Sequence, residues 1–242
     1  MVEGSIPPGR TMDIQANKDK KLSIATTEGE YLRIPIKTHL ITREDNIEKI
    51  VRTYALPHLQ EGDILFVSER IVAITQGRAY KLEEINPSRL AKFLSRHVTK
   101  TPAGIGIGSP YTMELAIHEA GALRILFAAA IAAITKPFGA RGIFYHVVGN
   151  RINAIDGPCD YTLSPFGKYA KLGPKDPDLV AQALSHVTHT PVVIIDANDL
   201  GVEILGKSTP SLKNAYLKEL FRDNPLGQTD EQTPMAIVRK SS

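Results

Sequence analysis

Three short, largely apolar runs constrain the fold of this 242-residue chain more than any other feature. They span residues 64–67 (ILFV), 143–148 (IFYHVV) and 191–195 (PVVII), and each is rich in β-branched or aromatic residues. Runs of this length and composition are typical of strands in a protein core, and residues 31–36 (YLRIPI) alternate as a further strand would. The sequence therefore predicts a sheet built from segments far apart in the chain.

Helical signals lie between these strands. Apolar spacing indicates helices near residues 44–54, 86–97, 179–186 and 211–221, and Ser109-Pro110 is a typical helix start that opens a long helix ending at Lys136. The fold class is therefore α+β (mixed α/β). We expect residues 1–22 to form a flexible arm and residues 23–242 a single domain.

Two of the predicted strands each lead to an aspartate. Asp156 follows a short apolar return at 152–155 and precedes Gly157-Pro158, and Asp196 directly follows the run 191–195. If the two strand ends are adjacent, these carboxylates, with Asp160 or Asp199, form a Mg²⁺ or Mn²⁺ site with positions open for phosphate oxygens. The alternative is that the aspartates only accept hydrogen bonds from backbone N–H groups of the turns.

Two further places offer contacts for an anion. Lys37, Thr38 and His39 follow the strand at 31–36, and Arg70 lies between two apolar runs, where its guanidinium could hold a phosphate. The alternatives are a solvated strand end for the first group and a surface ion pair with Glu69 or Glu61 for Arg70.

Composition narrows the function classes. The net charge is +3 and the 29 Lys and Arg form no stripe, which favours small anionic ligands and predicts no nucleic-acid partner. Cys159 is the only cysteine and the N-terminus lacks the apolar stretch of a signal peptide, so we expect a cytoplasmic protein. The apolar run 125–134 is about half the length of a spanning helix, which predicts a buried helix and no membrane partner.

Residues 201–208 match the P-loop pattern G-x-x-x-x-G-K-S. Val202, Ile204 and Leu205 prefer extended backbone and would resist curling around a phosphate. We therefore expect a strand at 202–205 and no nucleotide there.

Five segments, taken in order from about residue 31 to 238, resemble motifs of the coenzyme F-420 gamma-glutamyl ligase family. The stretch 62–78 is similar to G-D-h-h-x-V-T-S-K-I-V followed by E-G-R. The others, with the family motifs in parentheses, are 153–156 (N-A-G-V-D), 174–178 (P-E-D-P-D), 193–196 (a strand ending in S-D-T) and 227–237 (G-Q-T-D-V-A-I).

This resemblance implies two intertwined subdomains, assembly as a homodimer, and a metal- and GTP-dependent (or ATP-dependent) amide ligase. Such an enzyme adds L-glutamate to a small-molecule carboxylate acceptor, a deazaflavin coenzyme F-420 precursor or a related metabolite, through an acyl phosphate. By motif position, two divalent ions, Mg²⁺ or Mn²⁺, would be held by Asp156 and Asp196, with Gln228 near them. The nucleotide and its phosphates would lie along Pro35, Ile36, Lys37, His39, Ser68 and Arg70.

The chain also departs from the family motifs. Glu69-Arg70 stands where the family has Ser-Lys, Pro158-Cys159 replaces Ser-Asn, and Ala197 replaces Thr. These changes motivate an alternative function, a non-catalytic nucleotide- or metabolite-binding protein that retains the ligase fold.

Overall fold

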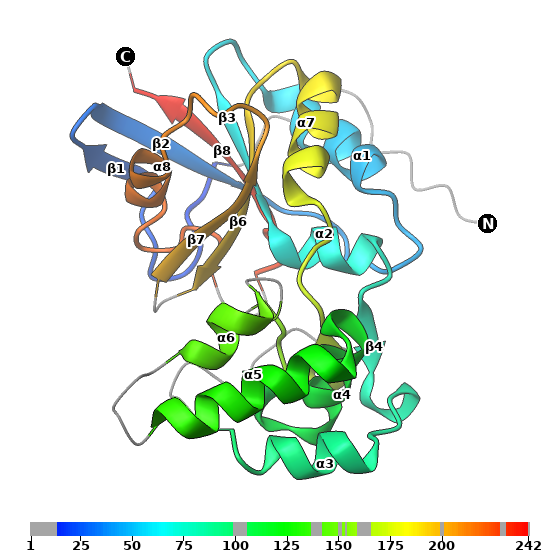
Figure 1. The fold of residues 1–242 in the computed structure, drawn as a ribbon. Coiled ribbons are helices and arrows are strands. Elements are labelled where there is room, and N and C mark those ends of the chain that lie inside the picture. Colours follow the sequence, from blue (N-terminus) through cyan, green and yellow to red (C-terminus); the bar gives the residue numbers. More distant parts are fainter. Residues whose placement is uncertain are drawn as a thin grey trace.

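The computed structural model describes residues 14–98, 106–136, 142–149, 152, 154–158, 166–198, 201–227 and 231–241. The chain forms two lobes (Figure 1). The sheet lobe contains a six-stranded sheet with helices α1, α2, α7 and α8, and the helical lobe contains α3 to α6 with the small sheet β4–β5. The predicted α+β class is therefore confirmed.

The six-stranded sheet has the strand order β1-β2-β8-β3-β6-β7. Its members are β1 (Ser23–Thr26), β2 (Gly29–Ile36), β3 (Ile64–Ser68), β6 (Val192–Asn198), β7 (Gly201–Lys207) and β8 (Met235–Lys240). Strands β3 and β6 are parallel, whereas β8 is antiparallel to both β2 and β3. Strands β2, β3 and β6 therefore run in the same direction, and their carboxyl ends share one edge of the sheet.

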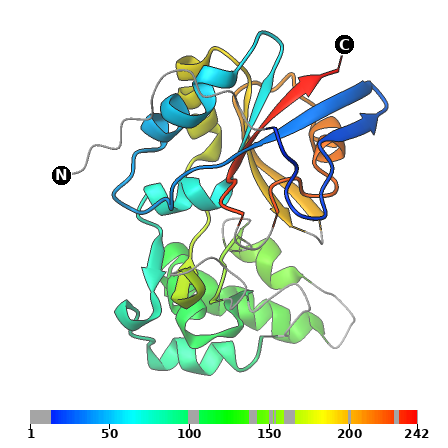
Figure 2. The ribbon, with the colours of Figure 1, turned by 180° about the vertical axis from the view of Figure 1, so that it is seen from behind.

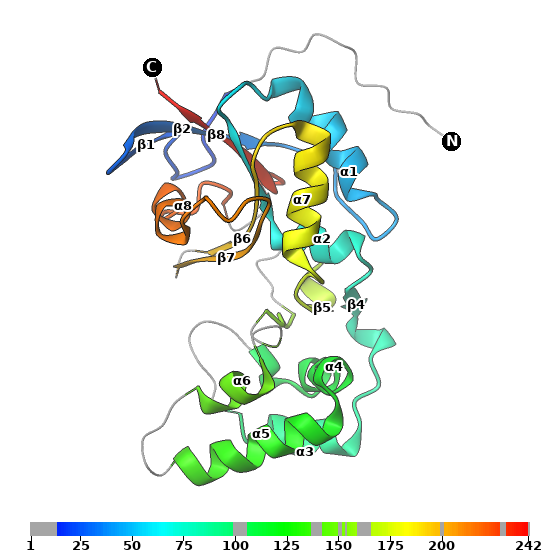
Figure 3. The same ribbon diagram turned by 45° about the horizontal axis from the view of Figure 1, so that its top comes forward.

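Strands β3 and β6 are the predicted runs 64–67 and 191–195, and both are central. Leu65 and Val67 pack toward α1 (Ile47–Ile50) and α7 (Pro177–Thr188), while Phe66 faces the other way. There it stacks on Phe221, after α8 (Asn214–Leu220), with ring centroids 4.1 Å apart. Figure 3 shows α7 and α8 on opposite sides of the sheet. Burial on both faces explains why these runs contain no polar residue.

The helical lobe is inserted between β3 and β6. After α2 (Glu69–Thr75) the chain leaves the sheet lobe, and it returns along β5 to begin α7; Figure 2 shows the same two connections from behind. The inserted elements are β4 (Ala79–Lys81), α3 (Arg89–Ser95), α4 (Pro110–Ala120), α5 (Ala122–Thr135), α6 (Ile143–Val148) and β5 (Tyr169–Lys171). This insertion gives the two lobes an intertwined topology.

The prediction of a strand at 143–148 is wrong, because this segment forms helix α6. Gly142 and Gly149 flank it at φ 74° and 104°, a region that favours glycine. The helix packs against α5, and Val148 is buried in the core of the helical lobe. A helix satisfies its backbone hydrogen bonds internally, so contacts with α5 override the β propensity of these residues.

The helix that begins at Ser109 is also shorter than expected. Ser109 Oγ accepts a hydrogen bond from Thr112 N and Pro110 takes the first position, as predicted. Gly121, at φ 85°, then separates α4 from α5. The two helices differ in direction by 114°. Among the described residues no single helix is long and apolar enough to cross a membrane, although this bent pair together meets the length and composition required.

The P-loop pattern forms strand β7, as expected. The Lys207 ammonium donates to the Leu212 carbonyl oxygen at 2.6 Å and to Asn214 Oδ1 at 3.0 Å. Ser208 Oγ accepts from the backbone N–H of Val192 at 2.9 Å. Both side chains hold the protein together at this point, which leaves no phosphate cradle here.

Candidate functional site

The candidate site begins where β3 ends and α2 begins. Ser68 is the N-cap of α2, and its Oγ accepts from the backbone N–H of Arg70 at 3.3 Å. This places Glu69 at the first position of the helix, at the carboxyl edge of the sheet and only 4% exposed. A polar group at such a strand end is well placed for ligand binding, because crevices form there in open α/β sheets.

Glu69 is paired with Lys171 from the helical lobe. The Lys171 ammonium, at the end of β5, donates to Glu69 Oε1, and both side chains are buried. The second oxygen of the carboxylate, Oε2, is buried and has no hydrogen-bond partner among the described residues. The pKa of Glu69 is raised to about 7: burial is the largest cause, the charges of Asp196 and Asp156 act in the same direction, and Lys171 opposes them.

Asp156 is held against the same lysine. Its backbone forms an isolated antiparallel bridge with Lys171, in which each N–H donates to the other's carbonyl oxygen at 2.9 Å. The Asp156 carboxylate reaches the ammonium at 3.3 Å from Oδ2, and its side chain is 54% exposed. The sequence predicts that Asp156 ends an extended apolar segment, but the structure shows only this single bridge. The bridge still places the carboxylate at the lip of the site.

Asp196 approaches from the sheet lobe. It follows Ile195, which is paired in register with Ser68, so it lies one residue beyond the end of β3 on the neighbouring parallel strand. Burial raises the pKa of Asp196, and the nearby charge of Asp156 raises it too, while Lys171 and Arg70 oppose the rise. The structure thus brings Asp156 and Asp196 close enough to interact, although they come from different lobes.

Arg70 adds a second positive charge. Its guanidinium forms no hydrogen bond or ion pair with another described residue, so the alternative of a surface ion pair with Glu69 or Glu61 does not hold. Its charge acts on Lys171 and Asp196. An arginine without a carboxylate partner beside acidic groups is available for a phosphate.

The other predicted nucleotide contacts lie at the same sheet edge, two strands away. Ile36 pairs with Met235 of β8, which in turn pairs with Val67 of β3. Pro35 is half-buried, Ile36 is buried and Lys37 is exposed.

His39 lies further along the same segment and is engaged elsewhere. Its Nδ1 is 2.9 Å from the Tyr54 hydroxyl and its Nε2 is 3.0 Å from Asp45 Oδ1. Because both ring nitrogens are occupied, His39 is a weaker candidate for phosphate than Lys37.

The carboxylates of this cluster supply part of the ligand set that a divalent cation needs. Asp156 and Asp196 supply the hard oxygen ligands that Mg²⁺ and Mn²⁺ prefer, and the unpaired Glu69 Oε2 is a further oxygen. Within the described ranges, however, no three His, Cys, Asp or Glu side chains already form a metal-binding group. The predicted ligand Gln228, together with Asp160 and Asp199, lies outside the described residues. The residues fit a cation held by two aspartates and completed by water or substrate oxygens.

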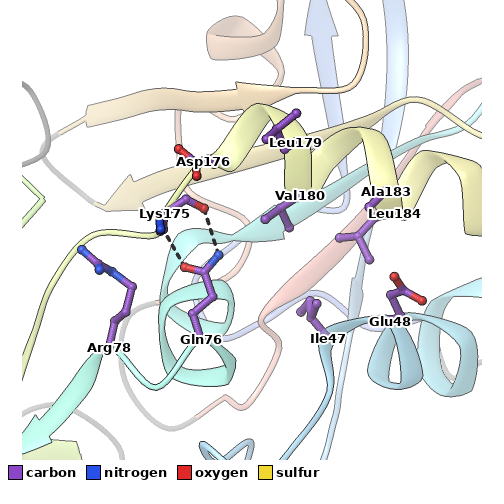
Figure 4. A pocket seen from close by; sticks show the side chains of 10 residues that line it. All are labelled: Ile47, Glu48, Gln76, Arg78, Lys175, Asp176, Leu179, Val180, Ala183 and Leu184. Atoms are coloured by element: carbon purple, nitrogen blue, oxygen red, sulfur yellow. Dashed lines mark hydrogen bonds between the residues drawn. The ribbon is translucent and has the colours of Figure 1, made fainter.

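A groove of about 540 Å³ lies between α1 and the start of α7 (Figure 4). At one end of the groove the Gln76 amide exchanges two hydrogen bonds with the backbone of Lys175, at 2.9 and 2.7 Å. Arg78 Nε donates to the carbonyl oxygen of Gly173 at 2.6 Å. The groove contains none of the clustered carboxylates, and these contacts instead pin the connection that carries Lys171.

The sequence analysis did not identify Lys171, and it treated Glu69 as an alternative ion-pair partner of Arg70 and as a departure from the family pattern. The one local signal for Lys171 is a lysine inside a short apolar stretch, Tyr169 to Leu172. A buried lysine there requires a carboxylate partner. That partner is 102 residues away in the chain, so its identity depends on the fold.

Comparison with known proteins identifies the family to which the chain belongs. A search of curated proteins found no significant match. A family model described as F420-0:Gamma-glutamyl ligase matches residues 35–201, which is more than half of the chain and contains Arg70, Asp156 and Asp196. The chain therefore belongs to the F-420 gamma-glutamyl ligase family.

Proposed function

We propose that this protein is a metal- and nucleotide-dependent amide ligase that adds L-glutamate to a small-molecule carboxylate acceptor through an acyl phosphate. Family membership indicates a ligase that acts on glutamate and an F-420 precursor. The observation that carries the finer proposal is the meeting of Asp156, Asp196 and Glu69 with Arg70 and Lys171 where the two lobes join. Carboxylates that could hold a metal ion, with cationic side chains beside them, suit phosphoryl transfer, in which catalysis is mostly positioning and stabilisation of charge.

Asp156 and Asp196 would hold Mg²⁺ or Mn²⁺, with Gln228 assigned to the same role from its motif alone. The cation would neutralise phosphate charge and align the reacting groups. Arg70 is free to contact a phosphate of GTP or ATP, and Pro35, Ile36, Lys37 and Ser68 would lie along the nucleotide. His39 is left out of this set because Asp45 and Tyr54 occupy it.

The proposed reaction has two steps. An oxygen of the acceptor carboxylate attacks the terminal phosphorus of the nucleotide, the bond to the bridging oxygen breaks, and GDP or ADP leaves. The amine of glutamate then attacks the acyl carbon, inorganic phosphate leaves with the bonding electrons, and the amine loses a proton. Burial between the lobes would favour this route, because water would otherwise hydrolyse the acyl phosphate.

The test is product formation from GTP or ATP, L-glutamate and the family's acceptor, F-420 without its glutamate, in the presence of Mn²⁺ or Mg²⁺. Mass spectrometry should detect the glutamylated acceptor, formed in equal amount with GDP or ADP. Asp156→Asn and Asp196→Asn should each abolish turnover. Glu203→Gln is the matched control, because Glu203 pairs in register with Asp196 but its exposed carboxylate is bound by Lys218. Full turnover by either aspartate variant would refute the proposed site.

Ligand-dependent stability separates this proposal from the binding-protein alternative. A ligand at about 100 times its Kd stabilises the native state by roughly 2.7 kcal/mol, which a thermal unfolding assay resolves. Stabilisation by Mn²⁺ and GTP without turnover on any carboxylate acceptor would favour the alternative. The homodimer implied by the family resemblance is part of the proposal, and sedimentation equilibrium would test it.

A further inference from the structure

The described site contains a cation of its own. Lys171 is 6% exposed, its ammonium contacts Glu69 Oε1, and the same nitrogen is 3.3 Å from Asp156 Oδ2. An ammonium bound by oxygens of two carboxylates takes up ligands that a divalent cation would need. The family resemblance, by contrast, implies two metal ions in this region.

We infer that Lys171 takes the place of one of these ions, so that each chain binds one divalent cation instead of two. This inference rests on the metal-dependent function proposed above. It makes Lys171 a positioning residue: its fixed charge balances Glu69 and holds Asp156 at the lip of the site.

The charges of the cluster support a single ion. Glu69, Asp156 and Asp196 together carry three negative charges when ionised, and Lys171 with Arg70 carries two positive charges. One divalent cation would leave the cluster with one net positive charge, which suits an incoming phosphate. A second divalent cation would have to lie against the buried ammonium, where like charges repel strongly because water is excluded.

The geometry leaves ligands for one ion. Asp196 forms no ion pair with another described residue, and the exposed Asp156 carboxylate has a second oxygen beyond the one that faces Lys171. Glu69 cannot release Lys171 without stranding its own buried carboxylate, whose Oε2 already lacks a partner. The lysine therefore stays in place when a metal binds.

The test is the number of Mn²⁺ ions bound per full-length chain, counted from the electron paramagnetic resonance signal of free Mn²⁺ during titration. The count is made without nucleotide and again at a fixed concentration of a non-hydrolysable GTP analogue. Wild type should bind one ion without nucleotide. Lys171→Ala, which frees the oxygens of Glu69 and Asp156 and leaves room for an ion, should bind one more than wild type in both conditions.

Two further variants control for general loosening of the site. Lys168→Ala removes an exposed lysine three residues earlier and should leave the count unchanged. Glu69→Gln combined with Lys171→Met removes the ammonium together with one of the freed carboxylates, and should show no gain.

The count of Mn²⁺ ions on wild type does not depend on the folding of any variant, so it can overturn the inference by itself. Two ions on the nucleotide-free wild type would overturn the inference and leave the proposed function intact. An unchanged count in folded Lys171→Ala would also overturn it. No Mn²⁺ on wild type in either condition would refute the metal-dependent function, and the inference with it.

Discussion

Removing Lys171 should reveal how strongly the two lobes depend on one buried ion pair. In Lys171→Met the Glu69 carboxylate, 4% exposed, keeps no cation and no hydrogen-bond partner among the described residues. Breaking a buried pair from one side costs about 3–5 kcal/mol. We expect about 3 kcal/mol, the lower end, because burial already raises the pKa of Glu69 and a protonated carboxyl is cheaper to bury.

The assay is urea denaturation followed by circular dichroism, with thermal unfolding beside it. For a chain of this size, about 3 kcal/mol corresponds to a fall in Tm of roughly 6–12 °C. Lys168→Met removes an exposed lysine from the turn before β5 and should change the free energy of unfolding by less than about 0.5 kcal/mol. The double variant Glu69→Leu, Lys171→Met replaces the pair by apolar groups and should recover most of the loss.

Two results would refute this reasoning. A cost for Lys171→Met no larger than that of Lys168→Met would show that Glu69 finds another partner or water. If the double variant is destabilised by the sum of the free-energy changes of the two single variants, the two side chains stabilise the fold independently.

Two other predictions concern the helical lobe and the strand with the P-loop pattern. Burial tends to raise the pKa of Glu114, but hydrogen bonds from the Ser88 hydroxyl and N–H lower it; Ser88→Ala should cost about 1–3 kcal/mol at pH 7. Because a lowered acid pKa stabilises the fold above its unfolded value, this cost should shrink as pH falls through the folded pKa, and urea unfolding at pH 7 and pH 3 checks the sign. A Cβ on Gly206 would lie 2.6 Å from the backbone N of Asp178, so Gly206→Ala should destabilise by about 1–3 kcal/mol or more, while Gly201→Ala meets nothing within 4 Å and should be nearly neutral in the same assay. Equal losses of GTP binding in both glycine variants, with stability unchanged, would instead support a P-loop.

Much of the sheet could be predicted because its signals are local. The runs 64–67 and 191–195 are apolar at every position, and a strand buried on both faces requires that pattern. Ser109-Pro110 begins a helix through contacts within four residues, and residues 202–205 are extended for steric reasons that each residue carries itself. The position of Asp196 followed directly from the strand before it.

The helical lobe was harder to predict, because its segments choose between structures through their neighbours. Residues 143–148 have the composition of a strand, yet α5 offers them a helical packing surface. Gly121 lies within a helical pattern, and only its positive φ shows that the helix breaks there. In both cases local preferences differ by less than the free energy of burying apolar side chains.

The sequence by itself determined the core strands, the aspartate that ends one of them, and the motifs that resemble the ligase family. Only the tertiary structure decided that Asp156 docks on β5 and that Lys171 neutralises Glu69. The physical reason is separation along the chain: Glu69 and Lys171 are brought together by the insertion of a whole lobe between β3 and β6. No spacing rule within a helix or strand reaches that far, so the charges that complete the site are set by how the two lobes meet.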